Sequence, residues 1–351
     1  MNCNNCNFIN PGGARFCAKC GNDMIANSLY AGVVDQNQIY SSRQSAWIYF
    51  RAICFVMALQ FLVAIVIGTM AVLNGDSGNG ILDNMVVTLF VMLLMQMCFF
   101  VSVLSGGVEP LKKIKYRLHL NVKLLLVSFA MWAVAFVAFL STNVYFGAFL
   151  DSIGYKSSSL EMNTPLEAVL GLFVIGIVAP ITEELVFRFG ILEGFRQKGY
   201  LKAVLLSGLA FALMHMNPEQ TFYQFLLGVV CAMAAFKSNS IVPAILIHAF
   251  NNLFSFVVGQ WAWFNESLEH LFNQTWFVLV AILLFVAGVF VTLKLANLCQ
   301  KFGNPKPNVS SVEKSLSNQS TSSCGTMLYC TTLGICVLFW ILTFAIAMSG
   351  K

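Results

Sequence analysis

Residues 85–104 read MVVTLFVMLLMQMCFFVSVL, an unbroken apolar run without a charged side chain. A helix that crosses a bilayer needs about 20 mostly apolar residues, and this run has that length. The rest of the chain has the same character: 58% of its residues are hydrophobic and only 10% are charged, whereas a soluble domain carries roughly 25% charged residues. The sequence therefore predicts an integral membrane protein that crosses the bilayer several times.

Runs of this kind predict an all-α transmembrane bundle of about eight or nine spans. The predicted spans are 47–73, 85–104, 124–144, 166 into the segment around 184, 201–216, 222–236, 241–259, 276–298 and 327–348. Composition divides the chain into a small module at 1–24, a polar linker at 25–46, a membrane domain at 47–300, a polar segment at 301–326 and an additional C-terminal span in 327–351. The segment 301–326 is rich in Ser, Asn, Lys and Pro, so we expect it to be disordered.

Basic residues gather in two of the connections between the predicted spans. They are Lys112, Lys113, Lys115, Arg117 and Lys123 after the second span, and Arg188, Arg196, Lys198 and Lys202 from the end of the fourth span onward. Cytoplasmic loops carry the excess of Lys and Arg, so both connections and the N-terminus are expected in the cytosol. The net charge of +5 is then a topology signal and gives no indication of nucleic-acid binding.

The first residues contain two closely spaced cysteine pairs, which predict a zinc ribbon in 1–24. The pairs are Cys3 with Cys6 and Cys17 with Cys20. Four thiolates from two tight turns complete a tetrahedral zinc shell, which leaves no position for water and makes the metal structural. Two disulfides are the alternative, but they require an oxidising compartment, whereas the predicted topology places this module in the cytosol. Its expected task is contact with a cytosolic protein partner or regulation, and a purely structural role is the alternative.

Ionisable side chains inside membrane spans are costly, so each one is a candidate functional residue. The fourth, fifth and seventh predicted spans contain Glu183, Glu184, Arg188, His215 and His248. Glu184 and Arg188 are four residues apart on one helix face and can form an ion pair. Glu183 is turned by about 100° from Glu184 and is free for another role. Pro180 should distort the helix one turn before Glu183.

Helix geometry predicts that these groups meet inside the membrane. At 1.5 Å per residue, Glu183 and His215 lie about 22 and 25 Å from the turn near Lys198. His248 and Asn252 lie about 13 and 20 Å from the next such turn. A carboxylate, two imidazoles and an amide can deprotonate a water and stabilise an oxyanion, or can hold a metal ion with a bound water. A single histidine in a span more commonly packs helices, and a proton-coupled transporter would use similar residues.

Three short motifs in order resemble those of a known protease family. EELVFR at 183–188 matches EExxxR, FALMH at 211–215 matches FxxxH, and HAFNN at 248–252 matches HxxxN. These are motifs of the CPBP family, the CAAX protease and bacteriocin-processing (Abi) intramembrane proteases. The resemblance covers about 165–256 and implies an intramembrane endopeptidase in a multi-pass membrane bundle.

The resemblance also implies a role for each motif residue. Glu183 would activate the hydrolytic water with help from His215, while His248 and Asn252 would stabilise the oxyanion or help to bind a metal. Glu184 and Arg188 would hold the site together. The family is commonly described as metalloproteases, but a metal-free mechanism with glutamate as the base has also been argued, so the resemblance leaves a catalytic metal undecided.

Segment 1–24 resembles the zinc ribbon that precedes membrane domains in many bacterial proteins. We therefore expect a multi-pass protein of a bacterial cell (inner) membrane, with a cytosolic N-terminus, a lipid bilayer around it and a peptide or membrane-protein substrate. A non-catalytic scaffold that recruits partners through the ribbon, and an ion-coupled transporter, are the alternatives.

The orientation can be tested with single cysteines in a background that lacks the native ones. A cysteine at Ser77 is expected to react with an impermeant thiol reagent from outside the cell, and a cysteine at Tyr116 is not, since the basic residues hold the second position in the cytosol. The opposite labelling pattern would show that the assignment is inverted.

The zinc ribbon can be tested on a peptide of residues 1–24. We expect it to bind one zinc ion under reducing conditions, measured by metal titration, and Cys17→Ser to weaken binding severely because the tetrahedral site loses a ligand. A peptide that binds no zinc would contradict the prediction.

Overall fold

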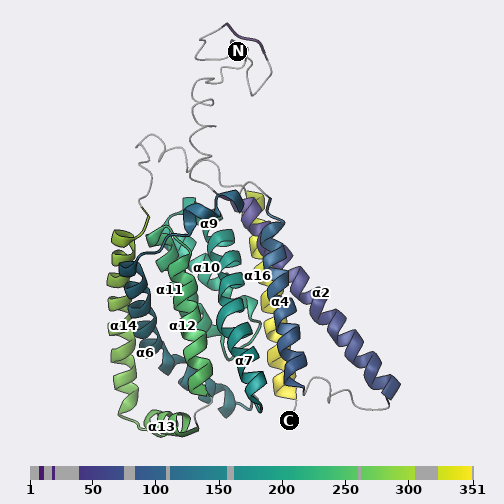
Figure 1. The fold of residues 1–351 in the computed structure, drawn as a ribbon, viewed down its shortest axis with the longest axis vertical. Coiled ribbons are helices and arrows are strands. Elements are labelled where there is room, and N and C mark those ends of the chain that lie inside the picture. Colours follow the sequence, from purple (N-terminus) through teal and green to yellow (C-terminus); the bar gives the residue numbers. More distant parts are fainter. Residues whose placement is uncertain are drawn as a thin grey trace.

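The structure is a computed structural model that describes residues 8–11, 18–19, 39–74, 84–107, 111–155, 162–259, 262–304 and 323–349. The predicted zinc ligands Cys3, Cys6, Cys17 and Cys20 lie outside the described residues, as does most of the segment 301–326. The described chain is a bundle of helices packed side by side, with one short helix, α13, across its end (Figure 1).

The helices follow the apolar runs of the sequence. They are α2 (Ser42–Asn74), α4 (Met85–Leu104), α6 (Val122–Ser152), α7 (Pro165–Phe173), α8 (Ala179–Glu184), α9 (Glu193–Phe195), α10 (Tyr200–Met214), α11 (Thr221–Ser238), α12 (Val242–Gly259), α13 (Ala262–Phe272), α14 (Phe277–Phe302) and α16 (Ser323–Ser349). Two π-helical segments, Val174–Val178 and Leu185–Leu192, join α7, α8 and α9 into one continuous span.

In the described part of the chain, eight helices are long and apolar enough to cross a membrane. They correspond to eight of the nine predicted spans, so the prediction of a polytopic membrane bundle is confirmed. The fifth predicted span, at 201–216, is α10, which has only 15 residues. At 1.5 Å per residue this helix is about 22 Å long, shorter than a hydrocarbon core of about 30 Å.

The start of the first span differs from the prediction. Helix α2 begins at Ser42, so the mostly polar residues 42–46 are helical and do not belong to a linker. Ser45 is fully buried, and its hydroxyl donates to the carbonyl oxygen of Gly190 at 2.7 Å. The polar composition predicts a linker here, but the hydrogen bond from Ser45 to Gly190 packs the first turn of α2 against the fourth span.

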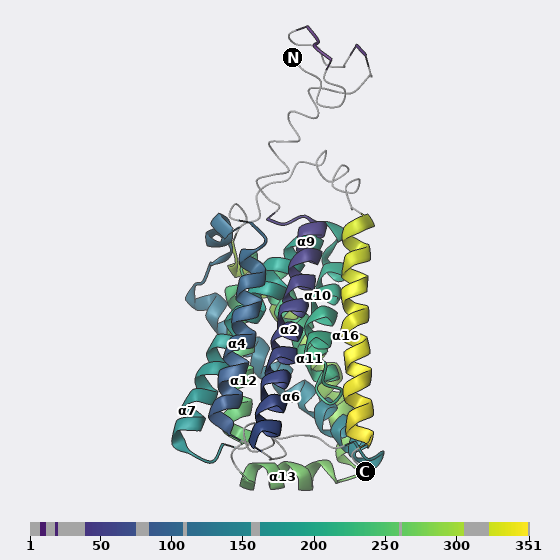
Figure 2. The same cartoon turned by 90° about the vertical axis from the view of Figure 1, so that its right-hand side faces the viewer.

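The last span packs against the other helices, although a long polar segment separates it from them in the sequence. Figure 2 shows α16 at one edge of the bundle. The rings of Tyr49 on α2 and Tyr329 on α16 lie 5.7 Å apart. The Tyr329 hydroxyl donates to the carbonyl of Leu206 at 2.5 Å, and the Trp340 indole donates to the Thr221 hydroxyl at 2.7 Å. Helix α16 is therefore fixed to α2, α10 and the start of α11.

An ionic cluster holds the α9 end of the bundle, opposite α13 (Figure 1). The Arg117 guanidinium donates to both oxygens of Glu193, at 3.0 and 2.8 Å, and Arg196 donates to the same carboxylate at 2.6 Å. Arg196 also donates to the carbonyls of Ala235 and Phe236 at the end of α11. The cluster thus ties the end of the fourth span to the connection before α6 and to α11.

The fourth span and α11 are the innermost of the candidate spans. In each, 56% of the residues in the apolar stretch are buried, compared with 11% in α2 and α16. Two glycines bring α10 and α11 into close contact. A Cβ atom at Gly228 would lie 3.0 Å from the Phe211 ring and 3.1 Å from the Cα atom of Gly208. Small residues allow such backbone approach between membrane helices. The approach sets the position of Phe211 beside the fourth span.

Gly228→Ala is expected to push α10 and α11 apart, because the added methyl group meets backbone atoms that cannot yield easily. Overpacking of this kind destabilises by about 1 to 3 kcal/mol, so the melting temperature of the purified protein should fall. Gly334→Ala on α16 is the matched control, since a Cβ atom there meets nothing within 4 Å. Equal melting temperatures for the two variants would contradict the close approach.

Candidate active site

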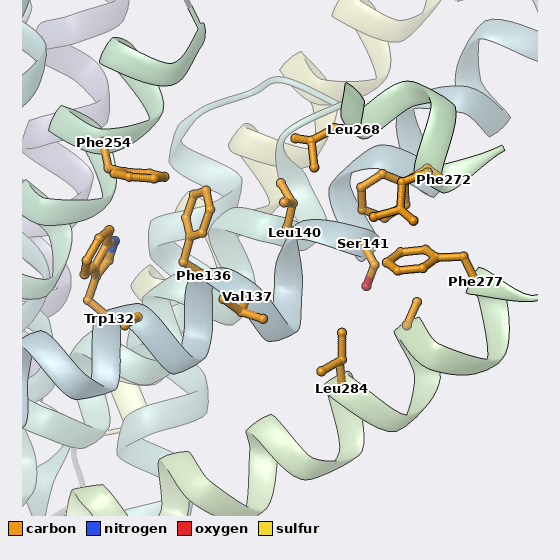
Figure 3. Close-up of a pocket in the computed structure, with 13 residues that line it drawn as sticks. Trp132, Phe136, Val137, Leu140, Ser141, Phe254, Leu268, Phe272, Phe277 and Leu284 are labelled. Carbon is orange, nitrogen blue, oxygen red and sulfur yellow. The ribbon is translucent and has the colours of Figure 1, made fainter. Parts of the chain in front are cut away.

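A cavity of about 350 Å³ lies between α6, α12, α13 and α14 (Figure 3). Its walls are apolar, with both aliphatic and aromatic side chains, and the polar groups among its lining side chains are the Ser141 hydroxyl and the Trp132 indole. Neither group is an acid or base near neutral pH. The cavity therefore lacks the equipment for hydrolysis, and the ionisable residues predicted from the sequence lie elsewhere.

The fourth span carries the first of these residues on a distorted helix. Pro180 has no N–H, and the Ala179 N–H donates to the Val174 carbonyl in a π-helical turn. The Ile175 carbonyl, whose π-type partner would be Pro180, accepts instead from the side-chain amide of Asn252 at 2.9 Å. The distortion predicted at Pro180 is confirmed, and it links the fourth span to α12.

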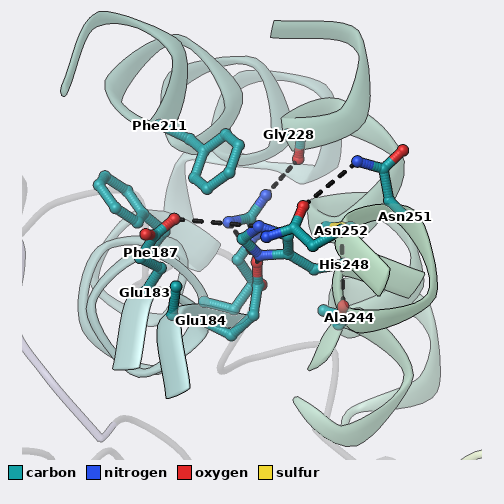
Figure 4. Close-up of polar contacts among 12 residues, drawn as sticks. Glu183, Glu184, Phe187, Phe211, Gly228, Ala244, His248, Asn251 and Asn252 are labelled. Carbon is teal, nitrogen blue, oxygen red and sulfur yellow. Dashed lines mark hydrogen bonds and ion pairs between the residues drawn. The ribbon is translucent and has the colours of Figure 1, made fainter. Parts of the chain in front are cut away.

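Glu184 and Arg188 form the ion pair that their spacing predicts. The Arg188 Nη1 and Glu184 Oε1 atoms are 3.0 Å apart, and both side chains are fully buried. The second Arg188 Nη atom donates to the carbonyl of Gly228 on α11 at 2.7 Å (Figure 4). The guanidinium also lies 4.7 Å from the centre of the Phe211 ring, a favourable cation–π distance.

His248, on α12, lies between the two glutamates. Its Nδ1 atom is 3.0 Å from Glu184 Oε1, and its Nε2 atom is 3.9 Å from Glu183 Oε2. A carboxylate paired with Arg188 only accepts hydrogen bonds, so we assign the Nδ1 proton to the contact with Glu184. In the neutral ring, Nε2 then presents its lone pair on the side of Glu183.

His215, at the end of α10, has the same tautomer. Its Nδ1 atom lies 2.8 Å from the carbonyl oxygen of Phe211, which can only accept, so its Nε2 atom is free of hydrogen in the neutral ring. The Phe211 ring is in edge contact with His215 at 5.0 Å and with His248 at 5.3 Å. Glu183 and His248 are both near enough to His215 to act on it electrostatically.

The amide of Asn252 is oriented by neighbours that the sequence did not suggest. Its Oδ1 atom accepts from the amide of Asn251 at 3.3 Å, and Asn251 in turn accepts a short hydrogen bond from the Tyr223 hydroxyl. One amide hydrogen of Asn252 is used by Ile175, which leaves the second for another acceptor.

Gln96 on α4 is a further residue that sequence reasoning missed. Its side-chain nitrogen donates to Glu183 Oε1 at 3.1 Å, and its oxygen accepts from the Thr182 hydroxyl at 2.5 Å. Glutamine is not ionisable, so the high cost of a charge inside a span does not single it out. A glutamine inside the apolar run 85–104 is the signal that could have found it.

Burial sets the electrostatics of the site. Glu183 is 6% exposed and His248 is 2% exposed, so each lies in a low-dielectric environment. Among the described residues, no three His, Cys, Asp or Glu side chains are grouped so as to hold a metal ion. The site brings together a carboxylate, imidazole nitrogens and amide donors.

The same segment of the chain matches one family of known proteins. Residues 165–254 match the family model of type II CAAX prenyl endopeptidase Rce1-like proteins. No curated protein and no solved structure matches the chain. The matched segment covers less than half of the chain, and it includes Glu183, His215, His248 and Asn252 but not Gln96. The match supports an intramembrane endopeptidase in general terms, with a membrane environment and a peptide substrate.

Proposed function

We propose that the protein is an intramembrane endopeptidase in which Glu183 is the general base that activates water. The observation that carries the proposal is the placement of Glu183 beside His248, with Glu184 neutralised separately by Arg188. One carboxylate is thus committed to an ion pair, while the other keeps an oxygen available for a proton. Two carboxylates in different environments commonly divide tasks in this way.

The proposed reaction is hydrolysis of a peptide bond. Glu183 takes a proton from water, assisted by His215, and the water oxygen forms a bond to the carbonyl carbon of the substrate. The remaining amide hydrogen of Asn252 and the imidazole of His248 stabilise the oxyanion. Glu184 orients the His248 ring through its contact with Nδ1. The carbon–nitrogen bond then breaks, and the proton held by Glu183 passes to the leaving amine.

The surroundings of the proposed enzyme follow from the sequence. We propose that it resides in a bacterial cell membrane with its N-terminus in the cytosol, and that a structural zinc ribbon at 1–24 contacts a cytosolic partner. Its substrate is a peptide or membrane protein. A comparison of membrane proteomes from cells with the wild type and from cells that lack the protein identifies substrates as intact proteins that accumulate in its absence.

Glu183→Gln is expected to abolish cleavage of such a substrate without loss of the protein, because the amide preserves shape but cannot take the proton. Glu167→Gln is a matched control in the same span. Glu167 caps the helix start through bonds to Asn163 and Thr164, which glutamine can also make. Cleavage and steady-state abundance are measured for both, and wild-type cleavage by Glu183→Gln would refute the general base.

Arg188→Ala is expected to reduce abundance as well as cleavage. It leaves Glu184, which is fully buried, without its cation, and breaking a buried pair costs about 3 to 5 kcal/mol. This contrast between Glu183 and Arg188 separates an enzyme from a scaffold or a transporter. In a scaffold, neither variant would cause an uncleaved protein to accumulate.

A further inference from the structure

The amide of Gln96 is enclosed between two adjacent residues of the fourth span. Gln96 is 7% exposed and lies in the middle of α4, a helix outside the segment that matches the protease family. A buried amide is costly unless its donor and acceptor are both satisfied. The amide oxygen lies 2.5 Å from the Thr182 hydroxyl, and the amide nitrogen lies 3.1 Å from Glu183 Oε1. Leucine would fill the same space in a span at less cost, so packing alone does not explain a glutamine here.

The Glu183 carboxylate determines which way the amide faces, because a carboxylate accepts hydrogen bonds and therefore takes the amide nitrogen. The amide oxygen then faces the Thr182 hydroxyl, whose single hydrogen is shared between this oxygen and the carbonyls of Val178 and Ala179. The nitrogen contacts Oε1 of Glu183, and the other oxygen, Oε2, is the one nearest His248 Nε2 at 3.9 Å. This separation is too long for a direct hydrogen bond. The two oxygens of Glu183 are thus inequivalent: Oε1 is bound by Gln96, and Oε2 faces the histidine.

We propose that Gln96 is the positioning residue of Glu183 and that Oε2 is the oxygen that accepts the proton from water. The inference rests on the proposed function, since it requires Glu183 to be the base. Gln96 holds one oxygen with a neutral donor, so the contact fixes the carboxylate without pairing it to a cation. Without this contact, the carboxylate is free to rotate, and Oε2 loses its fixed position.

The test uses Gln96→Met in the full-length protein, because methionine keeps the length of the side chain and removes both hydrogen bonds. The turnover number for a membrane protein that accumulates in cells without the enzyme should fall about 10- to 100-fold, the loss that outer hydrogen-bond partners of metal-ligating side chains typically cause. KM should stay within about twofold of the wild-type value, since Gln96 acts on the reactive group and not on substrate binding.

Thr182→Val provides a second, independent variant. It removes the hydroxyl that contacts the Gln96 amide oxygen, so a smaller fall in the turnover number is expected at unchanged KM. Because Thr182 acts through Gln96, the double variant should have the turnover number of Gln96→Met alone, whereas independent structural effects would multiply. If Gln96→Met does not fold, Thr182→Val alone tests the proposal: a lower turnover number at unchanged KM supports it, and an unchanged turnover number contradicts it.

Gln60→Met is the matched control. Gln60 lies on the neighbouring helix α2 and contacts Met95 of α4 at 3.6 Å, but it has no contact with Glu183. Its turnover number should equal that of the wild type. A turnover number for Gln96→Met within twofold of the wild type, or effects of Gln96→Met and Thr182→Val that multiply, would overturn the inference. Glu183→Gln shows which hypothesis is then wrong. If this variant is inactive, only the role of Gln96 is refuted. If it is active, the role of Glu183 as the general base is refuted as well.

Discussion

The ion pair between Glu184 and Arg188 is the contact on which the rest of the site depends. Two opposite charges buried among membrane helices must stay together, because each alone would be far more costly in this environment. The pair also recruits three other helices: the Gly228 carbonyl of α11 and the Phe211 ring of α10 receive the guanidinium, and His248 of α12 binds the carboxylate. One ion pair on the fourth span thus helps to fix the positions of α10, α11 and α12.

Adjacent glutamates acquire different properties from this arrangement. Glu184 faces a cation and a histidine, so its charge is neutralised inside the protein. Glu183 points about 100° away around the helix and meets only a neutral amide donor, with His248 at the edge of contact. Of these two adjacent residues, Glu184 is held in an ion pair, and Glu183 is the one that we propose for catalysis. His248 lies between them, so its two nitrogens experience different partners.

The irregular helix of the fourth span is the second device that shapes the site. Because Pro180 lacks an N–H, the Ile175 carbonyl is left for a side chain, and Asn252 takes it. A regular helix would satisfy Ile175 internally and would offer α12 no polar contact at this depth. The π-helical turns thus exchange backbone hydrogen bonds for a tertiary one. This tertiary bond fixes the amide that we propose as an oxyanion donor.

The sequence by itself determined the membrane class, eight of the spans, the distortion at Pro180 and the pairing of Glu184 with Arg188, since each depends on composition or on spacing within one helix. It also predicted that Glu183, His248 and Asn252 belong to one site, but not that Gln96 does. Only the tertiary structure decided that residues 42–46 are helical, that α16 joins the bundle, and that Gln96 reaches Glu183. These features depend on contacts between segments far apart in the chain, and no local pattern encodes which buried amide will face which carboxylate.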